Sequence, residues 1–326
     1  MKVFLFAALI LSVKLYGQSA EDFPVEEAKR ILSFLASDSL KGRGNGTMEL
    51  HKAAYFIEKE FKKDSLHHFP GFNSYLQPFS LLPLSEREQH VDTSGRFLSS
   101  KIMFNVVGLL PGNKFPEQVI VFSAHYDHVG TASSGSDYIF NGANDNASGT
   151  TALLMLAHYY AQQKNNARTL VFCAFAGEEL GLEGSNVFVN MINSKNVVAG
   201  INIEMIGSTS LSGKNAFFIT GESLSNLGQI LRKNLKGTPF RVVRKYDEKM
   251  LFQRSDNYSF AAEGIPAHTI MCSDDDDPCY HKVCDEVRRI DMANMVKVIR
   301  AIALASRTLV DGTDNPTRIK LKGVTK

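Results

Sequence analysis

The stretch that organises this chain is residues 119–127, which read VIVFSAHYD. An apolar run of strand length, Val119 to Ser123, leads almost directly into two ionisable residues, His125 and Asp127. Short apolar runs of this kind are typical of strands that are buried on both faces of a parallel sheet. Because ligands in open α/β sheets collect at the carboxyl ends of the strands, the same stretch predicts where a functional site lies.

The segments around this stretch alternate between strand and helix patterns. Further strands are predicted at residues 103–110, 169–176, 200–206, 216–220 and 267–272. Helices are predicted at residues 25–36, 50–61, 149–161, 182–192, 224–235 and 290–309. Such alternation indicates an α/β fold with a mostly parallel central sheet flanked by helices on both faces. Since no linker interrupts the pattern, we expect residues 19–326 to form a single domain.

The N-terminus has the features of a secretory signal. Lys2 precedes an apolar run, Val3 to Val13, which is too short to span a bilayer, and small or turn-forming residues follow at Gly17, Ser19 and Ala20. We therefore expect residues 1–18 to be a cleaved signal peptide and the mature protein to be secreted or periplasmic. No later stretch is apolar enough to predict a membrane span.

The charge of the chain argues against a polyanionic partner. The formal net charge is +2, and the first 17 residues contribute two lysines and no acidic residue, so the mature chain is neutral. A neutral protein offers no electrostatic reason to bind nucleic acid or an anionic membrane surface.

The cysteines predict one disulfide. Cys173 lies in a strand-like run and is expected to be a buried thiol, whereas Cys272, Cys279 and Cys284 are clustered. In a secreted protein one disulfide among these three is expected, but the spacing does not select the pair.

Histidines and carboxylates follow the predicted strands at several points along the chain. In chain order they are His125, Asp145, Glu178, Glu179, Glu204 and His281. Taken singly, each has an ordinary explanation, such as a helix cap, a solvated turn or a buried ion pair. Together they form the mixed imidazole and carboxylate set that suits zinc. Five ligands from this set of six are too many for one tetrahedral ion, whereas two zinc ions that share a carboxylate would use all five and leave a position for water.

The motifs of the chain resemble those of a known family, the co-catalytic zinc aminopeptidases of metallopeptidase clan MH, family 28. The matching segments occur in the family's order between about residues 30 and 300. They are LKGRGNGT (40–47), NVVGLLPG (105–112), HYD (125–127), NDNASG (144–149), AGEELG (176–181), IEMIG (203–207), SD (255–256), GIPA (264–267) and YH (280–281). The resemblance implies the phosphorylase/hydrolase-like fold of zinc exopeptidases.

The resemblance also implies a ligand set. Asp145 matches the carboxylate that bridges two zinc ions, His125 and Glu204 match the other ligands of one ion, and Glu179 and His281 match those of the second. Many family members have Asp at the position of Glu204, whose extra methylene changes the angle of approach to the metal. We still expect two zinc ions per chain.

Three further residues match catalytic positions of the family. Glu178 matches the general base, Asp127 matches the partner of the ligand histidine, and Tyr280 matches a tyrosine that polarises the substrate carbonyl. The implied activity is that of a secreted zinc-dependent aminopeptidase, which hydrolyses N-terminal residues from peptides that have a free N-terminus.

Three other functions fit the same scaffold. A glutaminyl-peptide cyclotransferase would use one zinc, but the segment 146–149 and the paired glutamates follow the peptidases. A carboxypeptidase or dipeptidase remains open. A non-catalytic binding domain would be expected to have lost ligand positions, and none is missing here.

Two polar loops and one acidic run lie outside the motifs. The loops, residues 131–141 and 244–257, are expected to line the pocket for the substrate side chain. The run Asp274 to Asp277 is interpreted as a solvated loop, with a calcium site or an attractor for the substrate amine as alternatives. The sequence sets neither side-chain specificity nor oligomeric state.

Overall fold

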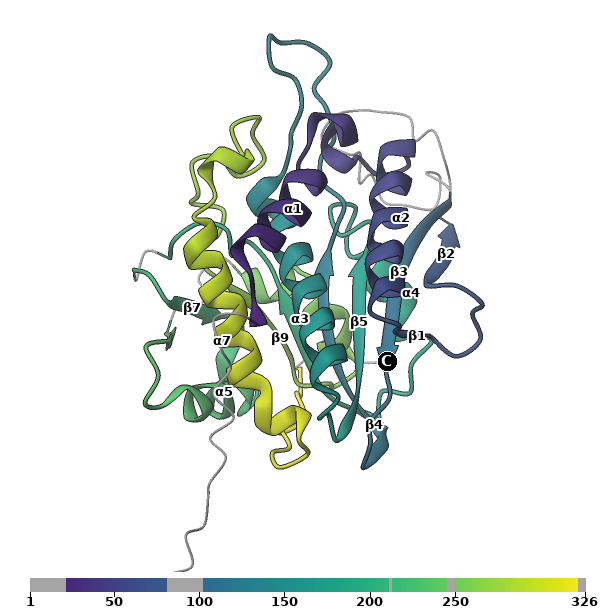
Figure 1. Ribbon diagram of the computed structural model, residues 1–326, viewed down its shortest axis with the longest axis vertical. Coiled ribbons are helices and arrows are strands. Elements are labelled where there is room, and N and C mark those ends of the chain that lie inside the picture. Colours follow the sequence, from purple (N-terminus) through teal and green to yellow (C-terminus); the bar gives the residue numbers. More distant parts are fainter. Residues whose placement is uncertain (1–21, 81–101, 211–212, 245–249, 322–326) are drawn as a thin grey trace, which may run out of the picture.

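The structure is a computed structural model that describes residues 22–80, 102–210, 213–244 and 250–321 (Figure 1). The predicted signal peptide, residues 1–18, lies outside the described residues, as do residues 245–249 of one predicted loop. Among the described helices, none has both the length and the apolar character needed to cross a membrane.

The described strands form one mixed sheet, in the order β1-β3-β5-β4-β6-β9-β7-β8 with β2 also paired to β3. The strands are β1 (His67–His68), β2 (Leu76–Ser80), β3 (Ile102–Leu110), β4 (Phe115–His125), β5 (Arg168–Phe175), β6 (Val197–Ile203), β7 (Ala216–Ile219), β8 (Arg241–Val243) and β9 (Ala267–Met271). The central strands β5, β4, β6 and β9 are parallel. Antiparallel pairs join β3 to β1, β2 and β5, and β7 to β9. The predicted fold class is confirmed, and the antiparallel pairs at both sides of the parallel core are a feature that the sequence did not indicate.

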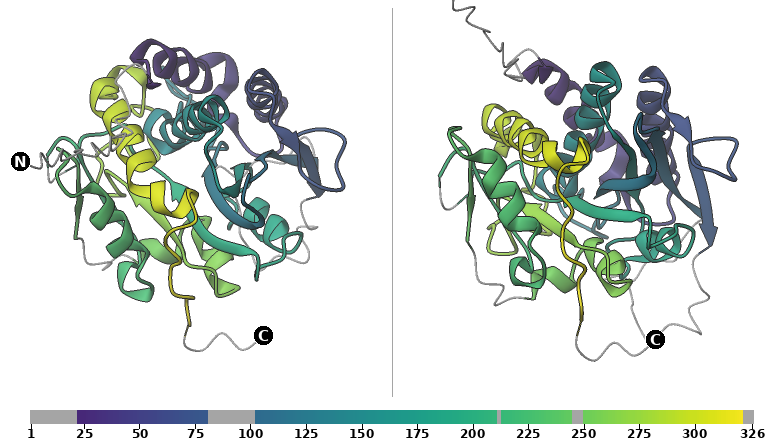
Figure 2. Two further views of the ribbon diagram at one scale, coloured as in Figure 1. Left: turned by 60° about the horizontal axis from the view of Figure 1, so that its bottom comes forward. Right: turned by 90° about the horizontal axis from the view of Figure 1, so that it is seen from below.

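Helices cover both faces of the sheet (Figures 1 and 2). On one face lie α1 (Val25–Leu35), α2 (Met48–Lys63), α3 (Gly149–Gln163) and α7 (Met292–Val310), with α5 (Leu227–Leu235) packed on α7. The shorter helices α4 (Glu183–Val189) and α6 (Asn257–Ala262) pack together on the other face. Short 3₁₀ helices span Asp38–Arg43, Glu222–Leu224, Leu251–Gln253 and Val287–Arg289, and a π-helical turn spans Ala143–Ser148.

Local sequence explains why these elements form. In α1 the buried residues Ala28, Ile31, Leu32 and Leu35 recur at helical spacing and face the core. Thr47 caps α2 by accepting a hydrogen bond from the Leu50 amide at 3.2 Å. Every residue of β5 is buried, as expected for a strand covered on both faces.

Strand β6 ends earlier than predicted. The sequence favoured a strand over residues 200–206, but β6 stops at Ile203, so Glu204 lies just beyond it. The Glu204 amide still donates to Ile270 of β9 at 3.1 Å, and the next residue, Met205, adopts a φ of 49°. A left-handed residue turns the chain out of the sheet. Glu204 is thereby delivered to the edge where β4, β5, β6 and β9 end.

Candidate metal and catalytic site

Asp145 lies at the centre of the candidate site. It belongs to the π-helical turn that precedes α3, and its side chain is buried. One carboxylate oxygen, Oδ1, is 3.4 Å from His125 Nε2, whereas the other, Oδ2, is 3.1 Å from His281 Nε2. The two carboxylate oxygens therefore face two different histidines.

The structure gathers potential ligands into two groups that share Asp145. One group is His125, Asp145 and Glu204, and the other is His128, Asp145, Glu179 and His281. Within each group the donor atoms all lie within 4.8 Å of one another. Every residue predicted as a metal ligand is thus brought to this site. His128 was missed, although it directly follows the segment HYD (125–127) and lies only three residues after His125.

The donor set fits divalent metal ions. His281 Nε2 is 3.1 Å from Asp145 Oδ2 and 3.3 Å from Glu179 Oε1, yet this buried nitrogen has no hydrogen-bond partner in the part of the chain that the structure describes. Donors that converge without hydrogen-bond geometry are expected around a common ion. Buried carboxylates beside imidazoles also need a compensating cation, and this ligand chemistry suits zinc.

Asp127 ties the His125 segment to the turn that carries the paired glutamates. Its backbone carbonyl lies 3.2 Å from His125 Nδ1, closer than its side chain, for which the distance is 3.7 Å. Its buried carboxylate accepts hydrogen bonds from Asn45 at 2.7 Å and from the amides of Glu178 and Glu179 at 3.3 and 3.2 Å. Asp127 can therefore orient the imidazole through its carbonyl and hold the glutamate turn through its side chain.

Glu178 lies in an environment suited to an acid–base group. Burial raises the pKa of Glu178 well above its usual range; His125 opposes this effect, and Glu204 and Glu179 reinforce it. Burial likewise raises the pKa of Glu204 to about 7, and the Ser255 hydroxyl donates to its carboxylate. A carboxyl group whose pKa is displaced toward neutrality can take up and release a proton near physiological pH.

A cavity of about 510 Å³ opens over Asp145, Glu178 and Glu204. Met205, Leu251 and Met271 form an apolar part of its wall, and the ring of Tyr280 also lines it. The predicted loop 244–257 contributes to the wall through its described residues 251, 253 and 254.

The other loop prediction, for residues 131–141, is wrong, because none of these residues lines this cavity. Thr131 pairs with Ile139, which closes the segment into a projecting hairpin (Figure 1). The side-chain amide of Asn141 donates through Nδ2 to the Ala36 carbonyl and to the Asp38 carboxylate, each at 2.9 Å. These bonds hold the base of the hairpin against the N-terminal elements and away from the cavity.

Comparison with known proteins agrees with this geometry. The model of peptidase family M28 matches residues 105–306, more than half of the chain. This chain belongs to peptidase family M28. The family membership expected from the motifs is thereby confirmed.

Proteins similar to this M28 chain in sequence or in fold include peptidases and a cyclase. Leupeptin-inactivating enzyme 1 of Streptomyces exfoliatus is 26% identical over 319 residues, which cover 90% of this chain and 64% of that protein. A zinc aminopeptidase from Bacillus subtilis matches with a TM-score of 0.68 at 16% identity, over 88% of this chain and 95% of that one. A glutaminyl cyclase from Bacteroides thetaiotaomicron matches with a TM-score of 0.64 at 16% identity, over 90% of this chain and 99% of that one. The two structures establish the fold, and the chain covers less than two thirds of the length of the curated relatives that it matches.

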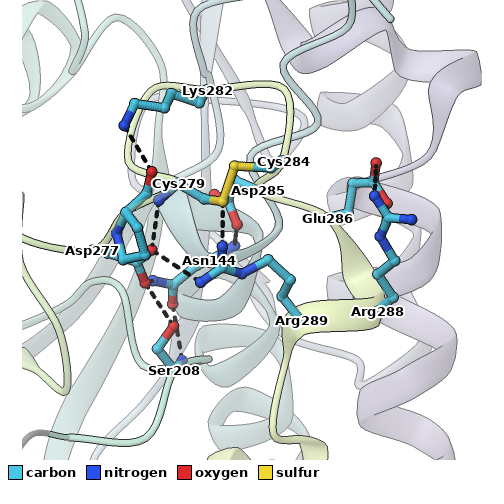
Figure 3. Close-up of a disulfide and its surroundings, with 11 residues drawn as sticks. Asn144, Ser208, Asp277, Cys279, Lys282, Cys284, Asp285, Glu286, Arg288 and Arg289 are labelled. Atoms are coloured by element: carbon cyan, nitrogen blue, oxygen red, sulfur yellow. Dashed lines mark hydrogen bonds and ion pairs between the residues drawn. A yellow bond between two sulfur atoms is a disulfide. The ribbon is translucent and has the colours of Figure 1, made fainter.

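A disulfide encloses two of the predicted site residues of this M28 chain. Cys279 is bonded to Cys284 (Figure 3). Tyr280 and His281 lie between the two cysteines in the sequence. Cys173 is a buried free thiol, as predicted, and Cys272 is also free and buried.

The segment after the disulfide holds the Asp145 turn. The carboxylate of Asp285 accepts hydrogen bonds from the backbone amides of Asn144 at 2.8 Å and Asp145 at 3.0 Å. Figure 3 shows Asp285 beside Asn144 and the disulfide. The disulfide loop therefore carries His281, and the residue directly after it, Asp285, anchors the backbone of Asp145.

The acidic run before the disulfide is more ordered than predicted. Asp274 is buried, and the Asp277 carboxylate accepts hydrogen bonds from Ser208 Oγ at 2.8 Å and from the Cys279 amide at 2.9 Å (Figure 3). The interpretation as a solvated loop is wrong for these two residues, because Asp274 is buried and Asp277 binds both Ser208 and the amide at the start of the disulfide loop.

Removal of this disulfide is expected to weaken metal binding. The double variant Cys279→Ser/Cys284→Ser should lose about 2 kcal/mol of stability, as expected for a short closed loop. It should also bind metal about tenfold more weakly, because His281 and the Asp145 turn lose a common support. Thermal unfolding and competitive zinc titration measure both effects. Cys173→Ala, a thiol variant within β5, should keep the wild-type metal affinity, and equal affinity in the disulfide variant would contradict the prediction.

The metal-free protein is expected to lose stability as the pH rises. Burial raises the pKa of Glu204 from 4.5 to about 7. Burial lowers the pKa of His281, but Asp145 and Glu179 outweigh it and raise the value from 6.5 to about 10. Both groups bind a proton more tightly when folded. Their contribution to the stability of the folded protein is complete at a pH below their unfolded-state pKa values. It is lost as the pH rises through the folded-state pKa values of about 7 for Glu204 and about 10 for His281.

Bound metal displaces these protons, so it should remove this pH dependence. The difference in Tm between metal-loaded and metal-free protein should therefore widen by several degrees between about pH 6 and about pH 9. Thermal melts with and without a chelator measure this difference in Tm. A difference that narrows as the pH rises would refute the raised pKa values of Glu204 and His281.

Proposed function

We propose that this chain is a secreted, zinc-dependent aminopeptidase that removes N-terminal residues from peptides. The observation that carries the proposal is the position of Asp145, whose two oxygens face separate histidine-containing groups. A carboxylate placed in this way is suited to bridge two ions. The half-buried Glu178 lines the same cavity, and its carboxyl supplies an acid–base group.

The proposed metal centre uses the two groups described above. His125, Asp145 and Glu204 would hold one zinc ion, and Asp145, Glu179 and His281 would hold the second. When bound, the zinc ions would polarise the scissile carbonyl and make water a stronger acid.

The remaining chemistry belongs to residues of the chain. The Glu178 carboxylate would accept a proton from the attacking water and pass it to the leaving amine, first as a base and then as an acid. Asp127 would keep Glu178 in place through the bond to its amide. Tyr280, at the cavity wall, would donate its hydroxyl proton toward the carbonyl oxygen as negative charge develops there.

The same site favours a substrate with a free N-terminus. The carboxylates of Asp145, Glu178, Glu179 and Glu204 line the cavity, so the proposed metal centre lies at its wall. An ion held by three protein ligands would keep a position that the lone pair of a free α-amine can fill, whereas the nitrogen of an acetylated terminus is a poor ligand because its lone pair is delocalised. This difference supports exopeptidase rather than endopeptidase action.

Glutaminyl-peptide cyclisation is the second candidate function, because a glutaminyl cyclase has a similar fold. A one-zinc cyclase would need a single set of ligands. Here a second set, completed by His125 and Glu204, is buried beside the first and shares Asp145. The presence of two complete sets favours the peptidase.

Activity on a matched substrate panel tests the proposal. The protein expressed from about Ser19 would be assayed on aminoacyl-p-nitroanilides, on their N-acetylated forms, on glutaminyl peptides, and on dipeptides and C-terminal substrates. We expect turnover of the free-amine substrates only, and loss of that turnover on chelation. Release of ammonia from glutaminyl peptides alone would identify a cyclase, and cleavage confined to dipeptides or C-terminal substrates would identify the other exopeptidases.

We further propose that residues 1–18 are a signal peptide and that residues 19–326 form one peptidase domain in a secreted or periplasmic protein. Determination of the N-terminus of the exported protein tests this, and retention of Met1 would refute it.

A further inference from the structure

His128 lies inside the ligand cluster although no predicted role accounts for it. Its side chain is fully buried, and its Nδ1 lies 3.0 Å from Glu179 Oε1 and 3.8 Å from Asp145 Oδ2. His281 Nε2 approaches the same two oxygens, at 3.3 and 3.1 Å. Two imidazole nitrogens therefore converge on one pair of carboxylate oxygens.

The separations between these donors match those around a zinc ion. Zinc–ligand bonds of about 2.0–2.1 Å at tetrahedral angles separate neighbouring donors by about 3.3 Å. The four separations observed here run from 3.0 to 3.8 Å. A hydrogen bond from His128 to Glu179 would explain the shortest of them, but it would not explain why the same nitrogen also faces Asp145.

The position of the His128 ring is built into the fold. Gly142 packs against it, and a Cβ atom at Gly142 would lie only 2.5 Å from the ring Cδ2. The His128 amide donates to the Arg43 carbonyl at 3.2 Å, and the buried Arg43 guanidinium donates to the carbonyls of Asn141 and Gly142. His128 Nε2 has no hydrogen-bond partner among the described residues, so the polar contacts of the ring are made by Nδ1.

We propose that His128, through Nδ1, is a fourth protein ligand of the metal ion held by Asp145, Glu179 and His281. The inference rests on the metal centre of the proposed function. It makes the two metal positions different, because one has four protein ligands and the other has three.

This asymmetry assigns separate tasks to the two positions. Sites with four protein ligands are closed, whereas catalytic sites keep one position open. The open position therefore belongs to the group of His125, Asp145 and Glu204. The ion in the closed position would hold Asp145 and Glu179 in place next to the open position.

Two substitutions separate a ligand from a hydrogen-bond donor. His128→Asn places an amide N–H near the position of Nδ1, so it keeps a donor for Glu179 but is a poor zinc ligand. His128→Ala removes both functions. His268→Asn is the matched control, because His268 is also buried but its nitrogens contact Ser225 and the Thr220 carbonyl at 2.7 and 2.8 Å.

Each protein would be freed of metal and titrated with Co²⁺, with affinity measured by chelator competition and coordination by visible absorption. We expect both His128 variants to bind the second ion about 100-fold more weakly, since even the loss of a ligand's supporting partner costs 10–100-fold. The absorption bands of that ion should change in both variants, while His268→Asn behaves as wild type.

Wild-type affinity and bands in His128→Asn would show that His128 only donates a hydrogen bond, and would overturn the inference. A wild-type protein that binds a single ion would instead refute the proposed metal centre itself. The number of histidine ligands can also be counted in the wild-type protein. NMR of the di-Co²⁺ protein should show three strongly shifted, exchangeable imidazole N–H signals, one each from His125, His128 and His281. Two such signals would exclude His128 as a ligand.

Discussion

Replacing Glu178 by Gln is expected to lower kcat by about 10³-fold, because positioned general acid–base groups contribute about 10²- to 10⁴-fold. The amide keeps the shape of the side chain but cannot accept a proton from water. Glu178 lies outside both ligand groups, so the variant should retain the metal content of the wild type. Steady-state kinetics on an aminoacyl-p-nitroanilide, together with metal analysis, measure the two effects.

The matched control is Glu117→Gln, which makes the same chemical change at an exposed position on β4. It should leave kcat unchanged. If Glu178→Gln retained more than about a tenth of wild-type kcat with full metal content, Glu178 would not be the general base.

Replacing Asp145 by Asn is expected to abolish tight binding of both metal ions. Burial raises the pKa of Asp145, but its contacts with His125 and His281 outweigh this and keep the pKa well below its usual range. The residue is therefore a charged carboxylate between the two groups, and a neutral amide cannot bridge two ions. Activity should fall by about 10³- to 10⁴-fold, because a bound metal supplies several kcal/mol of transition-state stabilisation.

Zinc content after dialysis and the Tm of the metal-free protein distinguish this effect from misfolding. Asp137→Asn, at an exposed site on the projecting hairpin, should keep both ions and full activity. Retention of two tightly bound ions by Asp145→Asn would show that another residue bridges them.

The order of strands and helices could be predicted from the sequence because it depends on local patterns. The apolar run before His125 and the helical spacing in α1 each reflect burial of one segment, and such periodicity is visible without knowledge of the neighbours. The antiparallel strands at the sides of the sheet could not be predicted in this way, since pairing direction depends on segments far apart in the chain.

The pairing of the cysteines likewise could not be predicted from the sequence. Cys279 and Cys284 have Cα atoms 5.3 Å apart, within the range of a disulfide. Cys272, seven residues before Cys279, follows β9 and directs its thiol toward the Ala216 carbonyl in the core. The spacing of the three cysteines contains no information about these directions.

By itself, the sequence determined the α/β class and the position of the candidate site, because parallel strands of any such sheet present their carboxyl ends at one edge. Only the tertiary structure decided that His128 turns toward Glu179 and Asp145. The reason is packing. The ring lies where it does because Gly142, which is distant in sequence from β4, leaves the space that a side chain would fill.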